Sequence, residues 1–154
     1  MEQHCVKFVI KKQKVMDTTN TQRAIKFRAW DKLEKRFFYP DKGYQGHYVL
    51  YLNGQFQNLQ NGSGGDEYVV QQWTGFVDAK GKEIYEGDIG SVNFYPKLHA
   101  VIKFGEYCGK DYYDQDGYGW FIDFEFDRYA FVKNWPKNTT IIGNIFENSE
   151  LLKQ

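Results

Sequence analysis

Residues 48–59, YVLYLNGQFQNL, give the clearest local indication of the fold. Its Asn53-Gly54 dipeptide is the one best suited to a type I′ turn, because both residues tolerate a positive φ. The residues before the turn, 48–52, and those after it, 55–59, are long enough for two short strands. This stretch therefore predicts a tight antiparallel hairpin.

Similar units lie on both sides of this hairpin. Apolar and polar residues alternate over 25–29, and the polar stretch 31–35 separates them from the aromatic run 37–39, which predicts another hairpin. Residues 68–73 have the composition of a strand, and Asp-Ala-Lys-Gly at 78–81 supplies the next turn. Turns recur every ~8–12 residues, a spacing typical of an antiparallel sheet.

The second half continues the pattern, with strands expected at 84–94, 99–104, 120–126 and 139–145. We expect Gly90 to carry a bulge, because Val92 and Phe94 share a face while Ile89 falls out of step with them. Tyr95-Pro96-Lys97 is expected to turn the chain. A bent strand of this kind suits a small barrel.

Helix is predicted only near 148–152, so the helix content should be well below the globular average. The predicted fold class is mainly β, an antiparallel barrel or sandwich with very little helix, whose second half resembles a small SH3-type barrel. Residues 1–22 are expected to be a tail outside the domain, with Val6, Phe8 and Ile10 as an edge strand or translation from Met16 as alternatives.

Composition excludes several classes of protein. The chain has 154 residues, equal numbers of acidic and basic side chains, and 19% aromatic residues, enough to build a core without disulfides. Its longest apolar stretch, 48–52, is far shorter than the ~20 residues that cross a bilayer. Cys5 and Cys108 form no disulfide framework. We therefore expect a cytoplasmic protein with free thiols and no membrane association.

Charge is unevenly distributed despite the neutral total. Residues 1–42 hold 11 Lys and Arg against 5 Asp and Glu, whereas residues 105–128 hold 2 against 7. Lys26 and Arg28 share a strand face beside Trp30, where the cations could contact phosphates while the ring stacks on a base. Nucleic-acid binding through this basic hairpin is the alternative hypothesis.

Motifs that carry chemistry are weak. The acidic loop 111–117 resembles a calcium loop, but a tyrosine stands where the first ligand belongs. Asp123, Glu125 and Asp127 alternate along one strand, at a spacing that a pair of catalytic carboxylates could use. The solvent-exposed face of an ordinary half-buried strand shows the same alternation. The scattered histidines match no zinc pattern. No metal, cofactor or enzymatic activity is expected.

Three blocks of sequence together resemble the YopX family of phage and prophage proteins. They are IKFRAWD at 25–31, QWTGFVDAKGKEIYEGDI at 72–89 and IIGNIFEN at 141–148. The resemblance covers roughly residues 23–152, as an N-terminal β part at 23–66 and a small-barrel part at 67–147. It implies a small β protein from a phage or prophage, in a bacterial cytoplasm, with no settled activity. Gly90-Ser91 departs from the valine that usually follows the family's Gly-Asp-Ile unit.

The positions that fit the family motifs are Arg28, Trp30, Asp31, Tyr85, Glu86, Gly87 and Asp88. They are candidate binding residues, and a structural role is available for most: core aromatics, a positive-φ turn, and acceptors for turn N–H groups. The functional expectation is a non-enzymatic binding or interaction module that recognises a host or phage macromolecule. Surplus aromatic residues often mark an interface, so the high aromatic content is compatible with a homo-oligomer.

Overall fold

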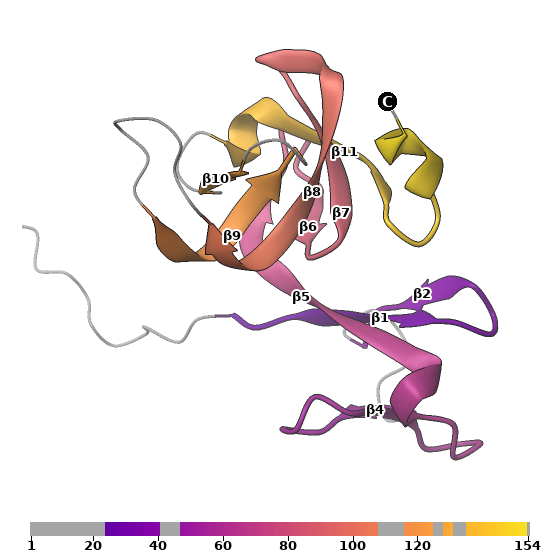
Figure 1. Cartoon of the computed structure of the whole chain (residues 1–154). Helices are drawn as coiled ribbons and strands as arrows, with labels where there is room; N and C mark the ends of the chain where they lie inside the picture. Colours follow the sequence, from indigo (N-terminus) through magenta and orange to yellow (C-terminus); the bar gives the residue numbers. More distant parts are fainter. Residues whose placement is uncertain (1–23, 41–46, 108–115, 125–127, 131–134, 154) are drawn as a thin grey trace, which may run out of the picture.

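The computed structural model describes residues 24–40, 47–107, 116–124, 128–130 and 135–153. In these ranges the chain forms antiparallel strands, arranged as two larger sheets and a separate hairpin (Figure 1). Residues 1–22, Cys108 and most of the acidic loop 111–117 lie outside them.

The first sheet has the strand order β2-β1-β5-β6. Its members are β1 (Phe27–Asp31), β2 (Arg36–Phe38), β5 (Tyr68–Val77) and β6 (Glu83–Tyr85). The predicted hairpin around residues 31–35 is confirmed as β1–β2. The long strand β5 runs from this sheet toward the second one and so links the two halves (Figure 1).

The hairpin of β3 (Tyr48–Leu50) and β4 (Phe56–Asn58) is present, but its predicted type I′ turn is wrong. The loop is longer, because Tyr51 N–H donates to Gln55 O at 2.8 Å and Gly54 N–H donates to Tyr51 O at 2.9 Å. Gly54 has a φ of 84°, whereas the φ of Asn53 is not positive. The Asn53 side chain instead accepts the N–H of Gln55 at 3.1 Å, which stabilises the wider turn.

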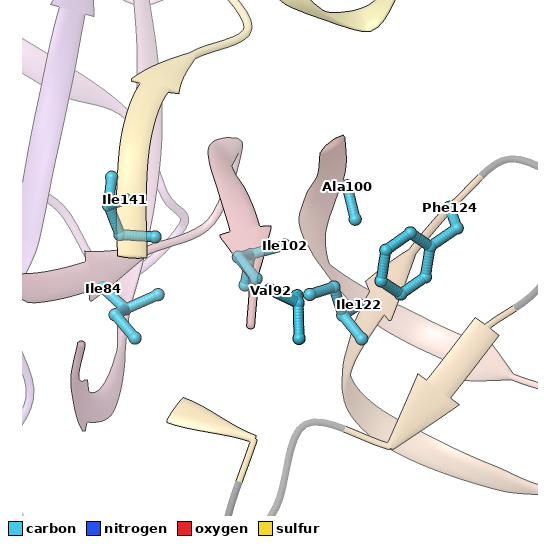
Figure 2. Packing of buried hydrophobic residues seen from close by; sticks show 7 residues of the cluster. All are labelled: Ile84, Val92, Ala100, Ile102, Ile122, Phe124 and Ile141. Atoms are coloured by element: carbon cyan, nitrogen blue, oxygen red, sulfur yellow. The ribbon is translucent and has the colours of Figure 1, made fainter. Parts of the chain in front are cut away.

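The second sheet has the order β10-β9-β8-β7-β11 and curls into a half-barrel (Figure 1). Its strands are β7 (Asp88–Val92), β8 (Tyr95–Tyr107), β9 (Gly117–Asp123), β10 (Arg128–Ala130) and β11 (Thr139–Asn144). Its main core cluster consists of Ile84, Val92, Ala100, Ile102, Ile122, Phe124 and Ile141 (Figure 2). A second cluster of Ala29, Phe38, Phe56 and Tyr68 joins the first sheet to the β3–β4 hairpin.

Two details of the second half differ from expectation. Gly90 itself pairs regularly, with Ala100 on one side and Ile141 on the other. The irregularities lie beside it, between Ile141 and Gly143 in β11 and between Ser91 and Val92 in the pairing of β7 with β8. Gly90 allows a close approach, because a Cβ there would lie 2.6 Å from Thr139 Cγ2. The predicted turn at 95–97 is also wrong: the chain turns at 93–94, and 95–97 belong to β8.

Helix is confined to short 3₁₀ turns in the described residues: η1 (Gly65–Glu67), η2 (Pro136–Asn138) and η3 (Ser149–Leu152). The mainly β, antiparallel fold class with very little helix is therefore confirmed. In the part of the chain that the structure describes, no helix is long and apolar enough to cross a membrane. The division between residues 23–66 and 67–147 stays a prediction.

Candidate functional site

A buried polar cluster joins the beginning and the end of the domain. Arg28 on β1 donates from Nη2 to Asp88 Oδ1 at 2.6 Å and from Nε to Gln71 Oε1 at 2.8 Å. Asn144 on β11 donates to the same two acceptors, to Gln71 Oε1 at 3.2 Å and to Asp88 Oδ1 at 3.3 Å. Asp88 Oδ2 accepts the N–H of Tyr85 at 2.8 Å. Because these groups satisfy one another, the cluster is stable although it is removed from water.

Aromatic rings enclose this cluster. The Arg28 guanidinium lies 4.3 Å from the Phe37 ring centroid and 4.6 Å from that of Tyr85, a favourable cation–π geometry. Trp30 stacks on Phe146 with centroids 5.3 Å apart and an interplanar angle of 6°. The rings therefore attach the C-terminal segment to the first hairpin.

The structural roles predicted for several motif residues are confirmed. Trp30 and Tyr85 are buried core aromatics, and Gly87 has a φ of 75°. Asp31 accepts the N–H groups of Leu33 and Glu34, each at 2.8 Å.

The face of the first hairpin predicted to contact phosphates has its cations, Lys26 and Arg28, paired within the protein. Arg28 is only 3% exposed and pairs with Asp88, and Lys26 pairs with Glu83 while its amine lies over the Trp73 ring. Nucleic-acid binding stays a prediction, but the contact mode proposed for it, with Arg28 on a phosphate and the buried Trp30 on a base, is wrong for this conformation.

The carboxylate row of the second half also differs from expectation. Asp123, expected on the outer face, is 8% exposed, and its Oδ2 lies 2.8 Å from Lys103 Nζ and 3.6 Å from Arg128 Nε. These two cations cover the carboxylate and neutralise it. Glu125 and Asp127 lie outside the described residues. No group of three or more metal-ligating side chains occurs in the described ranges.

A groove of about 630 Å³ lies between the two sheets, next to the buried cluster. Its walls come from β5, from the turn between β6 and β7, from β8 and β9, and from the C-terminal segment. The lining residues are 69–71, 86, 87, 101–106, 121, 145, 146 and 152. Most of the lining is apolar, so the groove offers a largely hydrophobic surface.

Two motif residues, Glu86 and Gly87, line this groove, and Glu86 is the one with a charged side chain. Its side chain is half-buried, and desolvation by that burial raises the pKa of its carboxyl above the ordinary value. None of the described residues donates a hydrogen bond or offers a cation to this carboxylate. The groove therefore contains one desolvated acidic group that a ligand could pair.

Sequence reasoning missed Gln71, Asn144 and the groove. Gln71 lies within a predicted strand and Asn144 within the third family block, but neither carries a local signal of burial. Their partners lie 43 and 56 residues or more away along the chain. Only the register of β1 against β5, and of β7 against β11, brings them together.

Comparisons with known proteins identify a family and similar solved structures. The family model described as YopX protein matches residues 26–153. The crystal structure of protein EF1440 from Enterococcus faecalis is similar, with a TM-score of 0.50 and 26% identity over 85% of this chain and 99% of that one. Protein yopX from Bacillus subtilis gives a TM-score of 0.44 and 17% identity over 84% and 96%. No curated protein matches the chain.

Proposed function

We propose that this protein, which belongs to the YopX family, is a non-enzymatic binding module whose partner occupies the groove between the two sheets. The observation that carries the proposal is the half-buried carboxylate of Glu86, which has no partner among the described residues and lies in a largely apolar groove. The charges of Arg28, Asp88 and Lys103, which lie near it, are neutralised within the protein. A ligand in the groove would therefore meet mainly apolar surface, the desolvated carboxylate of Glu86 and, further along β8, the exposed Glu106.

The resemblance adds two elements to the proposal. It implies an accessory protein of a phage or prophage that acts in the cytoplasm of a bacterial host, on a host or phage macromolecule. The proposal does not depend on them, because the groove and its carboxylate are properties of this chain. The gene's neighbours in its genome would test the phage origin.

Affinity capture from host cells tests the proposed function when a groove variant is compared with wild type. Val69→Trp would fill the groove, whereas Val77→Trp places the same ring on exposed surface at the far end of the same strand. We expect the first variant to lose the captured partner and the second to retain it. Thermal melts must show that both variants fold, and Glu86→Arg replaces Val69→Trp if the latter does not. Capture that neither groove variant changes would contradict the proposal.

Nucleic-acid binding remains the alternative, from the basic excess of residues 1–42. Fluorescence polarisation with single- and double-stranded DNA and RNA at low salt separates the two functions. Binding that falls steeply with salt and is unchanged in Val69→Trp would favour the alternative. Nuclease treatment during the capture experiment distinguishes a protein partner from one held through nucleic acid.

A further inference from the structure

One edge of β8 is open where it borders the groove. β8 pairs with β9 from Val101 to Tyr107 without a register shift, whereas the described pairing with β7 ends at Val101. The last contact on the β7 side is the N–H of Gly87, which donates to Ile102 O at 2.8 Å. Beyond this point no described strand pairs with this edge of β8, and we call the strand position beside residues 103–107 the open lane.

The backbone groups along this edge point into the groove. Successive residues of a strand direct their N–H and C=O groups to alternate sides. Since Ile102 O faces the β7 side, those of Phe104 and Glu106 face it as well, and both residues line the groove. No backbone group in the described ranges pairs with them on that side. Such an edge is a template for an additional strand.

Glu86 lies at the start of this open lane. It immediately precedes Gly87, whose N–H makes the last contact to β8, and its own N–H donates to Gln72 O on β5 at 2.9 Å. The turn is therefore attached to both walls of the groove. A strand that paired with β8 in the open lane, in line with β7, would begin beside the Glu86 carboxylate.

The charges around the lane favour a cationic occupant. Glu86 and the exposed Glu106 both line the groove, and neither carboxylate has a partner among the described side chains. The one lysine of the lining, Lys103, is neutralised by Asp123. Pairing the desolvated Glu86 with a cation removes the cost of leaving that charge unpaired.

We infer that the occupant of the groove is an extended peptide segment of a partner protein, which adds as a strand to β8 at Phe104 and Glu106 and directs an arginine or lysine side chain at Glu86. This inference rests on the proposed function and specifies its ligand. Main-chain hydrogen bonds to β8 supply affinity, and the apolar groove and Glu86 supply specificity. The alternating side chains of the added strand suit a groove with one apolar wall.

Synthetic peptides test this inference on the full chain. The probe is a peptide of roughly seven residues, a common strand length, with alternating valine and threonine and a central arginine. Its matched controls carry citrulline, which keeps the shape but removes the charge, or N-methyl groups on one backbone edge. We expect the arginine peptide to bind about 10-fold more tightly than the citrulline peptide, as a charge-assisted pair requires. N-methylation of the paired edge should abolish binding.

Protein variants assign the contact. Glu86→Gln should reduce the preference for arginine over citrulline to near unity, whereas Glu34→Gln, on the remote β1–β2 turn, should leave it unchanged. Amide chemical shifts in two-dimensional NMR should move for Phe104, Glu106 and their neighbours on β8. A preference for arginine that survives in Glu86→Gln would overturn the inference.

Other results separate the inference from the proposed function. If capture depends on Val69 but no peptide binds, or the N-methylated peptide binds equally well, the groove is a binding site and the strand-addition inference is wrong. Concentration-dependent self-association that Glu86→Gln abolishes would show that the occupant is a second copy of the chain, which also overturns the inference. If neither groove variant affects capture, the proposed function itself fails.

Discussion

Asp88 lies 60 residues after Arg28 in the sequence, yet its Oδ1 accepts a hydrogen bond from Arg28 Nη2 at 2.6 Å. Both side chains are almost completely buried. The pair connects β1 of the first sheet with β7 of the second, and it is one of the contacts that hold the two halves of the domain together. Asn144 on β11 adds the last strand to the same contact.

Removing one partner of this pair should strongly destabilise the protein. We expect Arg28→Met or Asp88→Asn to lower the free energy of unfolding by roughly 3–5 kcal/mol, because each leaves a buried charge uncompensated. Chemical denaturation measures the change. The double variant should lose less than the sum of the two single ones. Arg36→Met is the matched control, since Arg36 pairs with Glu34 on the surface and its loss should cost at most about 1 kcal/mol.

Gly87 allows a second test of the same cluster. Gly87 and Gly54 both have a positive φ, so alanine at either position should cost about 1–2 kcal/mol in backbone strain. A Cβ at Gly87 would also displace the Gln71 amide, whereas nothing lies within 4 Å of one at Gly54. Gly87→Ala should therefore lose about 1 kcal/mol more than Gly54→Ala in denaturant melts, the typical value of the lost hydrogen bond to Arg28. Equal losses would mean that Gln71 moves without cost.

Local patterns were sufficient for much of the fold. Alternation over residues 25–29 and the turn at 78–81 predicted a hairpin and a turn that the structure confirms. These signals come from residues close together in the chain, where side-chain periodicity and turn chemistry act directly. The 3₁₀ turn at η3 also agrees with the short helical fragment expected near 148–152.

Features set by tertiary contacts could not be predicted. Gly90 is required by the close approach of Thr139, on a strand far along the chain, and the buried Asp123 pairs with Lys103 and Arg128, which its own alternating pattern does not indicate. Arg28 looked like a surface cation because lysine and arginine are mostly exposed. Only the strand register shows that it faces Asp88. The groove is likewise a product of how β5 and β8 are placed, which no local motif records.

Asp78 should make the fold sensitive to acid. Desolvation raises the pKa of its carboxyl, but the N–H groups of Ile141, Lys82 and Lys80 outweigh that effect and lower the pKa below the ordinary value of 3.8. A carboxyl whose pKa is lowered by folding stabilises the native state above its unfolded pKa, and this stabilisation is lost as pH falls through the folded value. Wild type should therefore lose stability below about pH 4.

Asp78→Asn should remove this acid-dependent contribution. An amide presents only one acceptor oxygen where the carboxylate uses both, so the variant should lose about 1–3 kcal/mol near neutral pH. Its melting temperature should then fall less steeply on acidification than that of wild type. Asp66→Asn, on the exposed η1 turn, is the control and should change neither quantity. Parallel pH profiles for wild type and Asp78→Asn would contradict the assignment.

Glu86 should affect stability in the opposite direction. Because burial raises the pKa of its carboxyl, the charged form destabilises the native state, and its cost appears as pH rises through the folded pKa. Glu86→Gln should therefore stabilise the protein near neutral pH, by about 0.5 kcal/mol, because solvent screens the partly exposed side chain. The gain should disappear on acidification below the ordinary glutamate pKa of 4.5, where the wild-type carboxyl is protonated in both the folded and the unfolded state. Thermal melts of both proteins across this pH range measure the difference.

Two outcomes of this comparison are informative. If Glu86→Gln gains stability and also loses the preference of the groove for arginine, the carboxylate is kept for binding at the expense of stability. If Glu86→Gln is less stable than wild type at neutral pH, the carboxylate has a cationic partner within the protein.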